Sequence, residues 1–173
     1  VLETDQITDP TSYALGFRIK YDEVAPGYKK IVSFRGTGDD NGLYFINSEI
    51  VFYPFGENDA INYEPDTWYD FVFSRSSDNV IRVYVVEGDG MVTKVYEEAD
   101  PSSASVPILV DDNYRFMFFM DDTFNGHEYA SGGSVQSLRV WNGPLAEGDI
   151  ANALGEAVTD ITVEAATLHA CLT

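Results

Sequence analysis

Apolar and polar residues alternate along most of this chain, the spacing of β-strands that bury one face. The longest alternation runs from Tyr13 to Tyr21, where apolar side chains share one face and Arg18 and Lys20 share the other. Further strands are predicted over residues 31–34, 43–46, 50–55, 68–74, 80–86, 92–96, 114–120 and 135–141. Around ten short strands predict two antiparallel sheets packed face to face, because a lone sheet would leave its apolar face in water.

One short helix is predicted near residues 145–155, after the turn formed by Asn142, Gly143 and Pro144. Its apolar residues recur at roughly helical spacing, and they are Leu145, Ile150, Ala153 and Leu154. Beyond the helix, the apolar residues of 158–173 suggest a final strand or tail. The predicted fold is therefore all-β, a two-sheet antiparallel β-sandwich of the jelly-roll type with one short helix.

The length and the composition favour a single domain over residues 1–173. At 173 residues and 45% hydrophobic, the chain is large enough for one well-filled core and too short for two comfortable domains. It contains no run of eighteen apolar residues, so we expect no membrane insertion. The start at Val1 lacks the basic-then-apolar pattern of a signal peptide, so we expect no targeting segment in this stretch.

The charge balance restricts the partners. With 29 acids against 10 bases, the formal charge is −19, which argues against nucleic acid and disfavours anionic membrane surfaces. So many carboxylates repel one another unless ions screen or bridge them, so salt or divalent cations should affect stability. A merely soluble acidic surface is the alternative explanation of the bulk charge. Cys171 is the single cysteine, so no intrachain disulfide can form.

A cluster of oxygen donors follows the aromatic strand predicted over residues 114–120. Its members are Asp121, Asp122, Asn125 and Glu128. Hard cations such as calcium take six to eight oxygen ligands, so we predict a calcium site there. Asp39 and Asp40 belong to a second acidic loop, which either contributes to the same site or forms a site of its own. The alternative is that Asp121 and Asp122 cap a turn through hydrogen bonds from their side chains to the backbone. Zinc is disfavoured, since one cysteine and two distant histidines give no tetrahedral set.

Catalysis is not expected. Glycoside hydrolases need paired carboxylates, and the strands carry no such pair at alternating positions. His127 and His169 have no serine or cysteine nucleophile beside them in a recognisable motif. We therefore predict that the protein is not an enzyme.

A resemblance to a known family rests on segments that follow one another in a set order. They include Tyr13-Ala14-Leu15-Gly16-Phe17-Arg18-Ile19, residues 40–45, 50–54, 68–75, 83–85 and 118–122, Gly132-Gly133 and residues 138–145. Over roughly residues 12–150, the chain resembles the laminin-G-like, concanavalin A-like jelly-roll domains of secreted bacterial surface proteins. Such domains are typically extracellular and often calcium-stabilised, and they serve in adhesion, glycan binding or the assembly of surface proteins.

The resemblance implies a secreted, non-catalytic binding or adhesion module whose partner is a glycan or a cell-surface protein. Two departures suggest a second hypothesis: the family's usual opening strand has only residues 1–10 available, and residues 158–173 are additional. The terminal segment could replace the missing strand, within this chain or in a neighbouring copy. The alternative function is thus a structural subunit of an extracellular filament or surface assembly, held by strand exchange with copies of itself.

Aromatic side chains at strand ends and loops are the candidate glycan contacts. We select Trp141, Tyr129 and Phe124. Trp141 is expected to point outward, because Leu138 and Val140 claim the inward face of its strand. Trp68 falls where the family pattern places a core tryptophan, so we expect it to be buried rather than to contact sugar.

Overall fold

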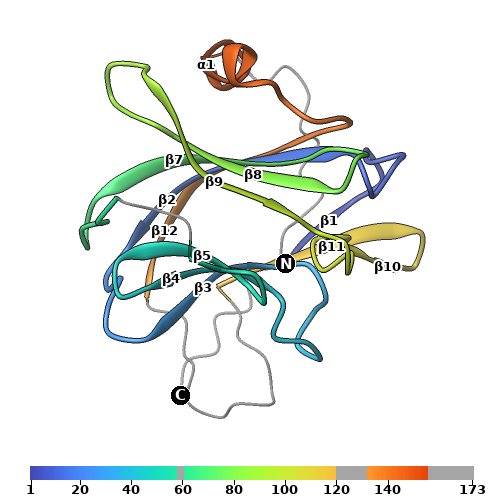
Figure 1. The fold of residues 1–173 in the computed structure, drawn as a ribbon, viewed down its shortest axis with the longest axis horizontal. Helices are drawn as coiled ribbons and strands as arrows, with labels where there is room; N and C mark the ends of the chain where they lie inside the picture. Colours follow the sequence, from blue (N-terminus) through green and yellow to red (C-terminus); the bar gives the residue numbers. More distant parts are fainter. Residues whose placement is uncertain (58–60, 120–131, 156–173) are drawn as a thin grey trace.

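The computed structural model describes residues 1–57, 61–119 and 132–155 of the chain. These residues form two antiparallel β-sheets packed face to face, with one short helix outside the sandwich (Figure 1). The predicted all-β sandwich with one helix is therefore confirmed. No helix in the described ranges is long and apolar enough to cross a membrane.

The seven-stranded sheet has the order β1-β11-β3-β4-β5-β6, with β10 also paired to β11. Its strands are β1 (Leu2–Thr4), β3 (Tyr28–Ser33), β4 (Gly42–Ile46), β5 (Glu49–Tyr53), β6 (Gly56–Glu57), β10 (Ile108–Val110) and β11 (Asn113–Phe118). The short strands β1, β6 and β10 were not predicted. A short strand does form within residues 1–10: Leu2 of β1 pairs with Phe116 of β11.

The five-stranded sheet has the order β12-β2-β7-β8-β9. Its strands are β2 (Tyr13–Tyr21), β7 (Trp68–Arg75), β8 (Val80–Val86), β9 (Val92–Ala99) and β12 (Gly133–Trp141). All five were predicted to within a few residues. The strand proposed within residues 158–173 lies outside the described residues.

Aromatic side chains from both sheets fill the space between them. The inward residues of β2, from Tyr13 to Tyr21, are each at most 2% exposed. Phe34, just after β3, lies 4.8 Å from Phe73 of β7, measured between ring centroids, and Phe17 of β2 lies 5.8 Å from Phe118 of β11. Such pairs add about 0.5–1.5 kcal/mol each beyond the burial of their area. The alternation along the sequence thus becomes one continuous core.

The helix α1 (Glu147–Gly155) covers part of the outer face of the five-stranded sheet (Figure 1). Ile150 is fully buried there against Ala14, Val72 and Tyr84. Gly16 lies under the ring of Trp141, and a Cβ atom at Gly16 would come within 2.7 Å of that ring. The outer face therefore has an apolar part beneath α1 and a part that α1 does not cover.

Candidate functional site

Most of the predicted site residues belong to one stretch that the structure does not describe. Asp121, Asp122, Asn125 and Glu128 of the calcium hypothesis lie in residues 120–131, outside the described residues, as do the candidate glycan contacts Phe124 and Tyr129. Their roles stay predictions.

The residues that flank this stretch lie near the end of β2. The ring of Phe119 is 5.2 Å from that of Tyr21, and the Phe119 amide donates to the Ile31 carbonyl. On the other side, the Asp22 amide donates to the Gly132 carbonyl over 2.9 Å. Both flanks of the predicted metal loop are therefore held at the same end of the sandwich.

Asp39 and Asp40 serve local hydrogen bonds. The Asp39 carboxylate accepts from the backbone and side-chain nitrogens of Asn41, at 2.9 and 3.0 Å. The Asp40 carboxylate accepts from the Tyr44 hydroxyl over 2.8 Å. Within the described ranges, no group of three or more His, Cys, Asp or Glu side chains is placed to hold a metal ion. Asp39 thus caps a turn, whereas the Asp40 carboxylate bonds the Tyr44 side chain, and the part of both in a metal site with undescribed residues stays a prediction.

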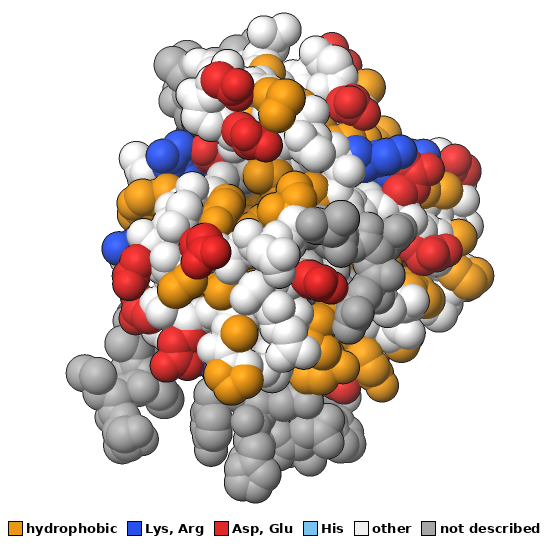
Figure 2. All heavy atoms as spheres, turned by 60° about the vertical axis from the view of Figure 1, so that its left-hand side comes forward, with side chains coloured by type: hydrophobic (Ala, Val, Ile, Leu, Met, Phe, Trp, Pro, Cys, Tyr) orange, Lys and Arg blue, Asp and Glu red, His pale blue; other side chains and the backbone are white. Residues whose placement is uncertain are grey.

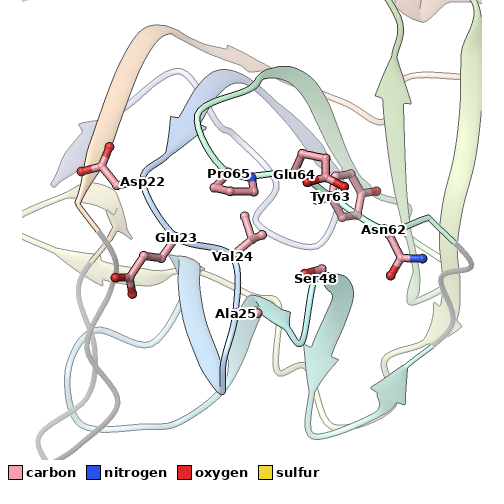
Figure 3. A pocket seen from close by; sticks show the side chains of 9 residues that line it. All are labelled: Asp22, Glu23, Val24, Ala25, Ser48, Asn62, Tyr63, Glu64 and Pro65. Atoms are coloured by element: carbon pink, nitrogen blue, oxygen red, sulfur yellow. The ribbon is translucent and has the colours of Figure 1, made fainter.

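A shallow pocket of about 470 Å³ opens beside the end of β2 (Figure 3). It is lined by residues 22–25, Ser48 and residues 62–65. The carboxylates of Asp22 and Glu23 lie on one side in Figure 3 and that of Glu64 on the other, so they do not converge on a point. The pocket offers acids to a ligand and no cation.

An exposed aromatic surface lies on the outer face of the five-stranded sheet where α1 does not cover it. Trp68 begins β7 and is 38% exposed, so the expectation that it is a core residue was wrong. The Arg18 guanidinium carbon and the Lys20 ammonium nitrogen each lie 5.9 Å from the centroid of its ring. We call Trp68, Arg18, Lys20 and Asp70 the tryptophan surface.

Strand alternation explains this position of Trp68. Phe71 and Phe73 of β7 face the core. Because side chains alternate between the two faces of a strand, Trp68 and Asp70 both face outward. Trp68 pairs directly with Lys20, and Asp70 pairs with Arg18. The sequence already carried this signal in the period of two along residues 68–74, and the family pattern pointed the other way.

One strong and one weak ion pair organise the tryptophan surface. Arg18 donates to the Asp70 carboxylate over 2.6 Å, with side chains that are 39% and 25% exposed. Lys20 lies 3.8 Å from Asp66, whose side chain is 76% exposed. Partial burial raises the pKa of the Asp70 carboxyl above its usual value, although Arg18 and Arg139 act in the opposite direction. Arg18 is thus held in one position, and Lys20 is held loosely.

Trp141 lies on the outer face of the sheet, as expected from its strand. It is half-buried, because its ring packs over Gly16 and beside Leu154 of α1. From the same strand, Arg139 donates to the Leu154 carbonyl near the C-terminal end of the helix. Positive charge is favourable at that end of a helix. In this structure Trp141 therefore joins the helix to the sheet, and its predicted contact with a glycan stays a prediction.

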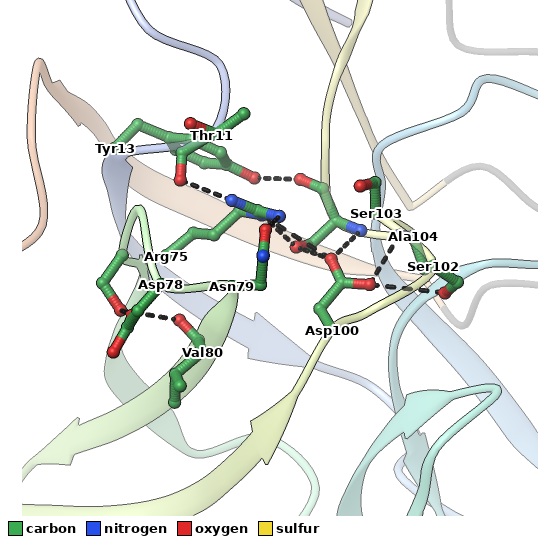
Figure 4. A network of polar contacts seen from close by, with 12 residues as sticks. Thr11, Tyr13, Arg75, Asp78, Asn79, Val80, Asp100, Ser102, Ser103 and Ala104 are labelled. Carbon is green, nitrogen blue, oxygen red and sulfur yellow. Dashed lines mark hydrogen bonds and ion pairs between the residues drawn. The ribbon is translucent and has the colours of Figure 1, made fainter.

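A buried polar network holds the loop after β9 (Figure 4). Arg75 and Asp100 are both fully buried, with 3.6 Å between the guanidinium and the carboxylate. Arg75 also donates to Ser105 and Asn79, each over 2.9 Å. The Asp100 carboxylate accepts from the amides of Ala104 and Ser105 over 2.7 and 2.9 Å. Because every charged group here is paired inside the protein, the network serves the fold and not a ligand.

The comparisons with known proteins agree on the fold alone. No family model and no curated protein matches this chain. Among solved structures, Domain 4 of AbnA, a GH43 extracellular arabinanase from Geobacillus stearothermophilus in complex with arabinotriose, is similar with a TM-score of 0.58 and 10% identity, over 82% of this chain and 66% of that one. A sialidase from Trypanosoma rangeli in complex with the inhibitor DANA has a TM-score of 0.55 and 18% identity, over 82% of this chain. A mutant of NanB sialidase from Streptococcus pneumoniae has a TM-score of 0.58 and 12% identity, over 85% of this chain.

This chain spans only part of those proteins. It corresponds to 22% of the Trypanosoma sialidase and to 24% of NanB. The similarity thus shows a β-sandwich of a kind found in proteins that act on carbohydrates. Because the chain corresponds to less than a quarter of each sialidase, the similarity does not transfer the activity of the whole enzymes to it.

Proposed function

We propose that this chain is a non-catalytic, extracellular glycan-binding or adhesion module that is stabilised by calcium. The observation that carries the proposal is the tryptophan surface, where Trp68 is exposed on a rigid sheet beside two cations. Aromatic side chains supply a large apolar contact at low entropic cost, and their polar neighbours fix the orientation of a ligand.

The fold supports a glycan rather than another ligand. The arabinanase domain of similar fold was solved in complex with arabinotriose, and the sialidases of similar fold act on a carbohydrate. Trp141, Tyr129 and Phe124 remain candidates for additional contacts. A cell-surface protein that carries such a glycan would be an adhesion partner of the same kind.

Calcium is proposed on the basis of the oxygen donors Asp121, Asp122, Asn125 and Glu128. Their loop is flanked by Phe119 and Gly132, which are fixed at the end of β2. A loop with anchored ends needs less ordering to bring several oxygens onto one ion. The net charge of the chain is −19, which favours the binding of a cation.

The absence of catalysis is proposed because the acids of the described residues have other partners or lie apart. Among the buried polar residues of the described ranges, Asp100 is the one acid, and it is paired with Arg75. The Asp70 carboxylate is held by Arg18. A glycosidase needs two carboxyl groups on either side of one glycosidic bond.

A glycan array tests this function. The full chain should bind a defined subset of glycans, binding should fall on addition of a chelator, and Trp68→Ala should weaken binding by at least about tenfold. Failure to bind any glycan on a broad array would contradict the proposal. So would the release of products from a polysaccharide in a hydrolysis screen.

The second candidate function is a structural subunit of an extracellular assembly, held by strand exchange. The edge strand β12 favours it, because among the described strands β12 pairs with β2 on one side and with nothing on the other. An open edge can accept an added strand through backbone hydrogen bonds. A β-bulge between Val135 and Ser137 weakens this edge as a template, so we rank this function second.

Size measurements separate the two functions. Strand exchange through residues 158–173 predicts concentration-dependent oligomers of the full chain that disappear when the chain is truncated at Val158. A monomer at all concentrations for both proteins would contradict strand exchange and leave glycan binding in place.

A further inference from the structure

The cations of this acidic chain are not spread evenly. Of its 10 basic residues, Arg18 and Lys20 lie two apart on β2, and Arg139 of β12 lies diagonally across from Arg18, since it pairs with Gly16. Figure 2 shows acidic side chains scattered over much of one face, whereas Lys and Arg gather at few places. The exposed tryptophan is therefore placed in one of the few cationic parts of the molecule.

The two cations beside Trp68 differ in how firmly they are held. Arg18 has a short bond of 2.6 Å to a carboxylate that is three-quarters buried, so its position is fixed. Lys20 has a 3.8 Å pair with the highly exposed Asp66 carboxylate, and such surface pairs contribute about 0–1 kcal/mol. Lys20 can therefore exchange Asp66 for the carboxylate of a ligand at low cost. Arg18 cannot exchange Asp70 in the same way.

The arrangement matches a sugar that carries a carboxylate. The apolar face of a pyranose ring can lie on the indole of Trp68 while a carboxylate of the sugar accepts a hydrogen bond from the Lys20 ammonium. The Lys20 ammonium nitrogen is 5.9 Å from the centroid of the indole ring, which is within reach of such a carboxylate. A neutral sugar would make the same contact with Trp68, but its hydroxyl oxygens would accept weaker hydrogen bonds from Lys20 than a carboxylate does. Charged hydrogen bonds are roughly twice as strong as neutral ones, so the charge decides between the two ligands.

The overall charge of −19 does not prevent this binding. At physiological ionic strength the Debye length is about 8 Å, so exposed acids on other faces are largely screened. Lys20 would act at contact distance, where screening is small. The ligand is consequently selected by the local charge at Trp68.

We infer that the glycan bound by this protein is acidic, with the sugar ring on Trp68 and its carboxylate on Lys20. Arg18 and Asp70 act as positioning residues, because they pair with each other beside Trp68 on the same face of the sheet. This inference rests on the proposed glycan-binding function and narrows its ligand to carboxylate-bearing sugars, whether uronic or sialic acids.

Calorimetry with matched pairs of sugars tests the inference. One pair is trigalacturonate and its methyl ester, and the other is sialyllactose and its methyl ester, so the members of each pair differ in charge on the same sugar backbone. The variants are Trp68→Ala, Lys20→Gln and Lys20→Arg. The matched controls are Tyr53→Ala, which removes an aromatic that is 39% exposed on the other sheet, and Lys94→Gln, which removes an exposed lysine on β9.

The inference expects at least tenfold tighter binding of the charged member of one pair, which also identifies the source of the carboxylate. Trp68→Ala and Lys20→Gln should each weaken that binding at least tenfold, Lys20→Arg should retain it, and both controls should leave it unchanged. Equal binding of charged and neutral members, or no loss on Lys20→Gln, would overturn the inference while glycan binding stands. Binding of no glycan at all, including on the array, would overturn both proposals together.

Discussion

Arg75 is among the largest side chains that are fully buried in the sandwich, and its charge is paired with the buried Asp100 carboxylate. A buried ion pair adds little to stability when both partners are present, but the loss of one partner leaves an uncompensated charge in the core. The Asp100 carboxylate also accepts two backbone amides of the following loop, from Ala104 and Ser105. Its loss would remove two of the hydrogen bonds that order this loop and would leave the bond from Arg75 to Ser105 as the direct link to β7.

We therefore expect Asp100→Ala to lower the free energy of unfolding by about 3–5 kcal/mol, the usual cost of breaking a buried pair. Urea denaturation at pH 7 measures it. Glu98→Ala is the matched control, because it removes an exposed acid two residues away and should cost less than about 0.5 kcal/mol. Similar costs for the two variants would contradict the structural role of the network.

Asp70 gives a pH dependence whose sign can be stated. Partial burial raises its pKa in the folded state above the ordinary value, so the folded protein binds its proton more tightly than the unfolded chain does. Stability from this group is then complete below pH 3.8 and is lost as the pH rises through the folded pKa. Asn does not titrate, so the stability of Asp70→Asn does not fall with rising pH through this group.

The difference in unfolding free energy, wild type minus Asp70→Asn, should therefore decrease as the pH rises from about 4 to 7. Urea denaturation at several pH values measures this difference. The contributions of the acids that both proteins share cancel in it. An increase over that range would show that Arg18 lowers the pKa of Asp70 more than burial raises it.

At the scale of elements, alternation predicted the long strands and failed for the short ones. β2, β7 and β8 have enough residues for a period of two to be visible. β1 has three residues, and it forms because β11 offers it backbone partners far away in sequence. β10 also has three residues, and it forms a hairpin with β11 across the two-residue turn Asp111-Asp112, whose residues both have positive φ. No local pattern carries the pairing of β1, so this strand could not be predicted. For β10 the two aspartates are a local turn signal, but three residues are too few to show alternation.

The candidate site shows the same division. The outward position of Arg18 and Lys20 followed from alternation, and that of Trp68 would have followed as well. The loose pair between Lys20 and Asp66 could not be predicted, because Asp66 lies in a loop whose path depends on a backbone bond from its amide to the Tyr21 carbonyl.

The contact between α1 and the sheet depends on Gly16. A methyl group there would lie 2.7 Å from the ring of Trp141 and 3.3 Å from Leu154, so the ring and the helix would have to move. We expect Gly16→Ala to lower the stability by about 1–3 kcal/mol through overpacking, and to increase the hydrogen exchange of α1 amides more than that of the strands. Gly88→Ala is the control, because nothing lies within 4 Å of its added methyl group. Unchanged exchange in α1 would contradict this account of the contact.

At the scale of the whole molecule, the excess of 19 negative charges makes ions part of the stability, and two effects must be separated. Screening by salt should raise the melting temperature of every variant alike. A bound calcium ion at 100-fold over its Kd adds about 2.7 kcal/mol, and each kcal/mol shifts the melting temperature by roughly 2–4 °C in a chain of this size. We expect calcium to raise the melting temperature of the wild type and of the control Asp89→Ala by roughly 5–11 °C more than sodium chloride of equal ionic strength does. A chelator should reverse this additional increase. Asp121→Ala and Asp122→Ala should keep the salt effect and lose the calcium effect. Equal responses of all four proteins to calcium would mean that the ion only screens the surface, and that the oxygen donors after β11 do not form a site.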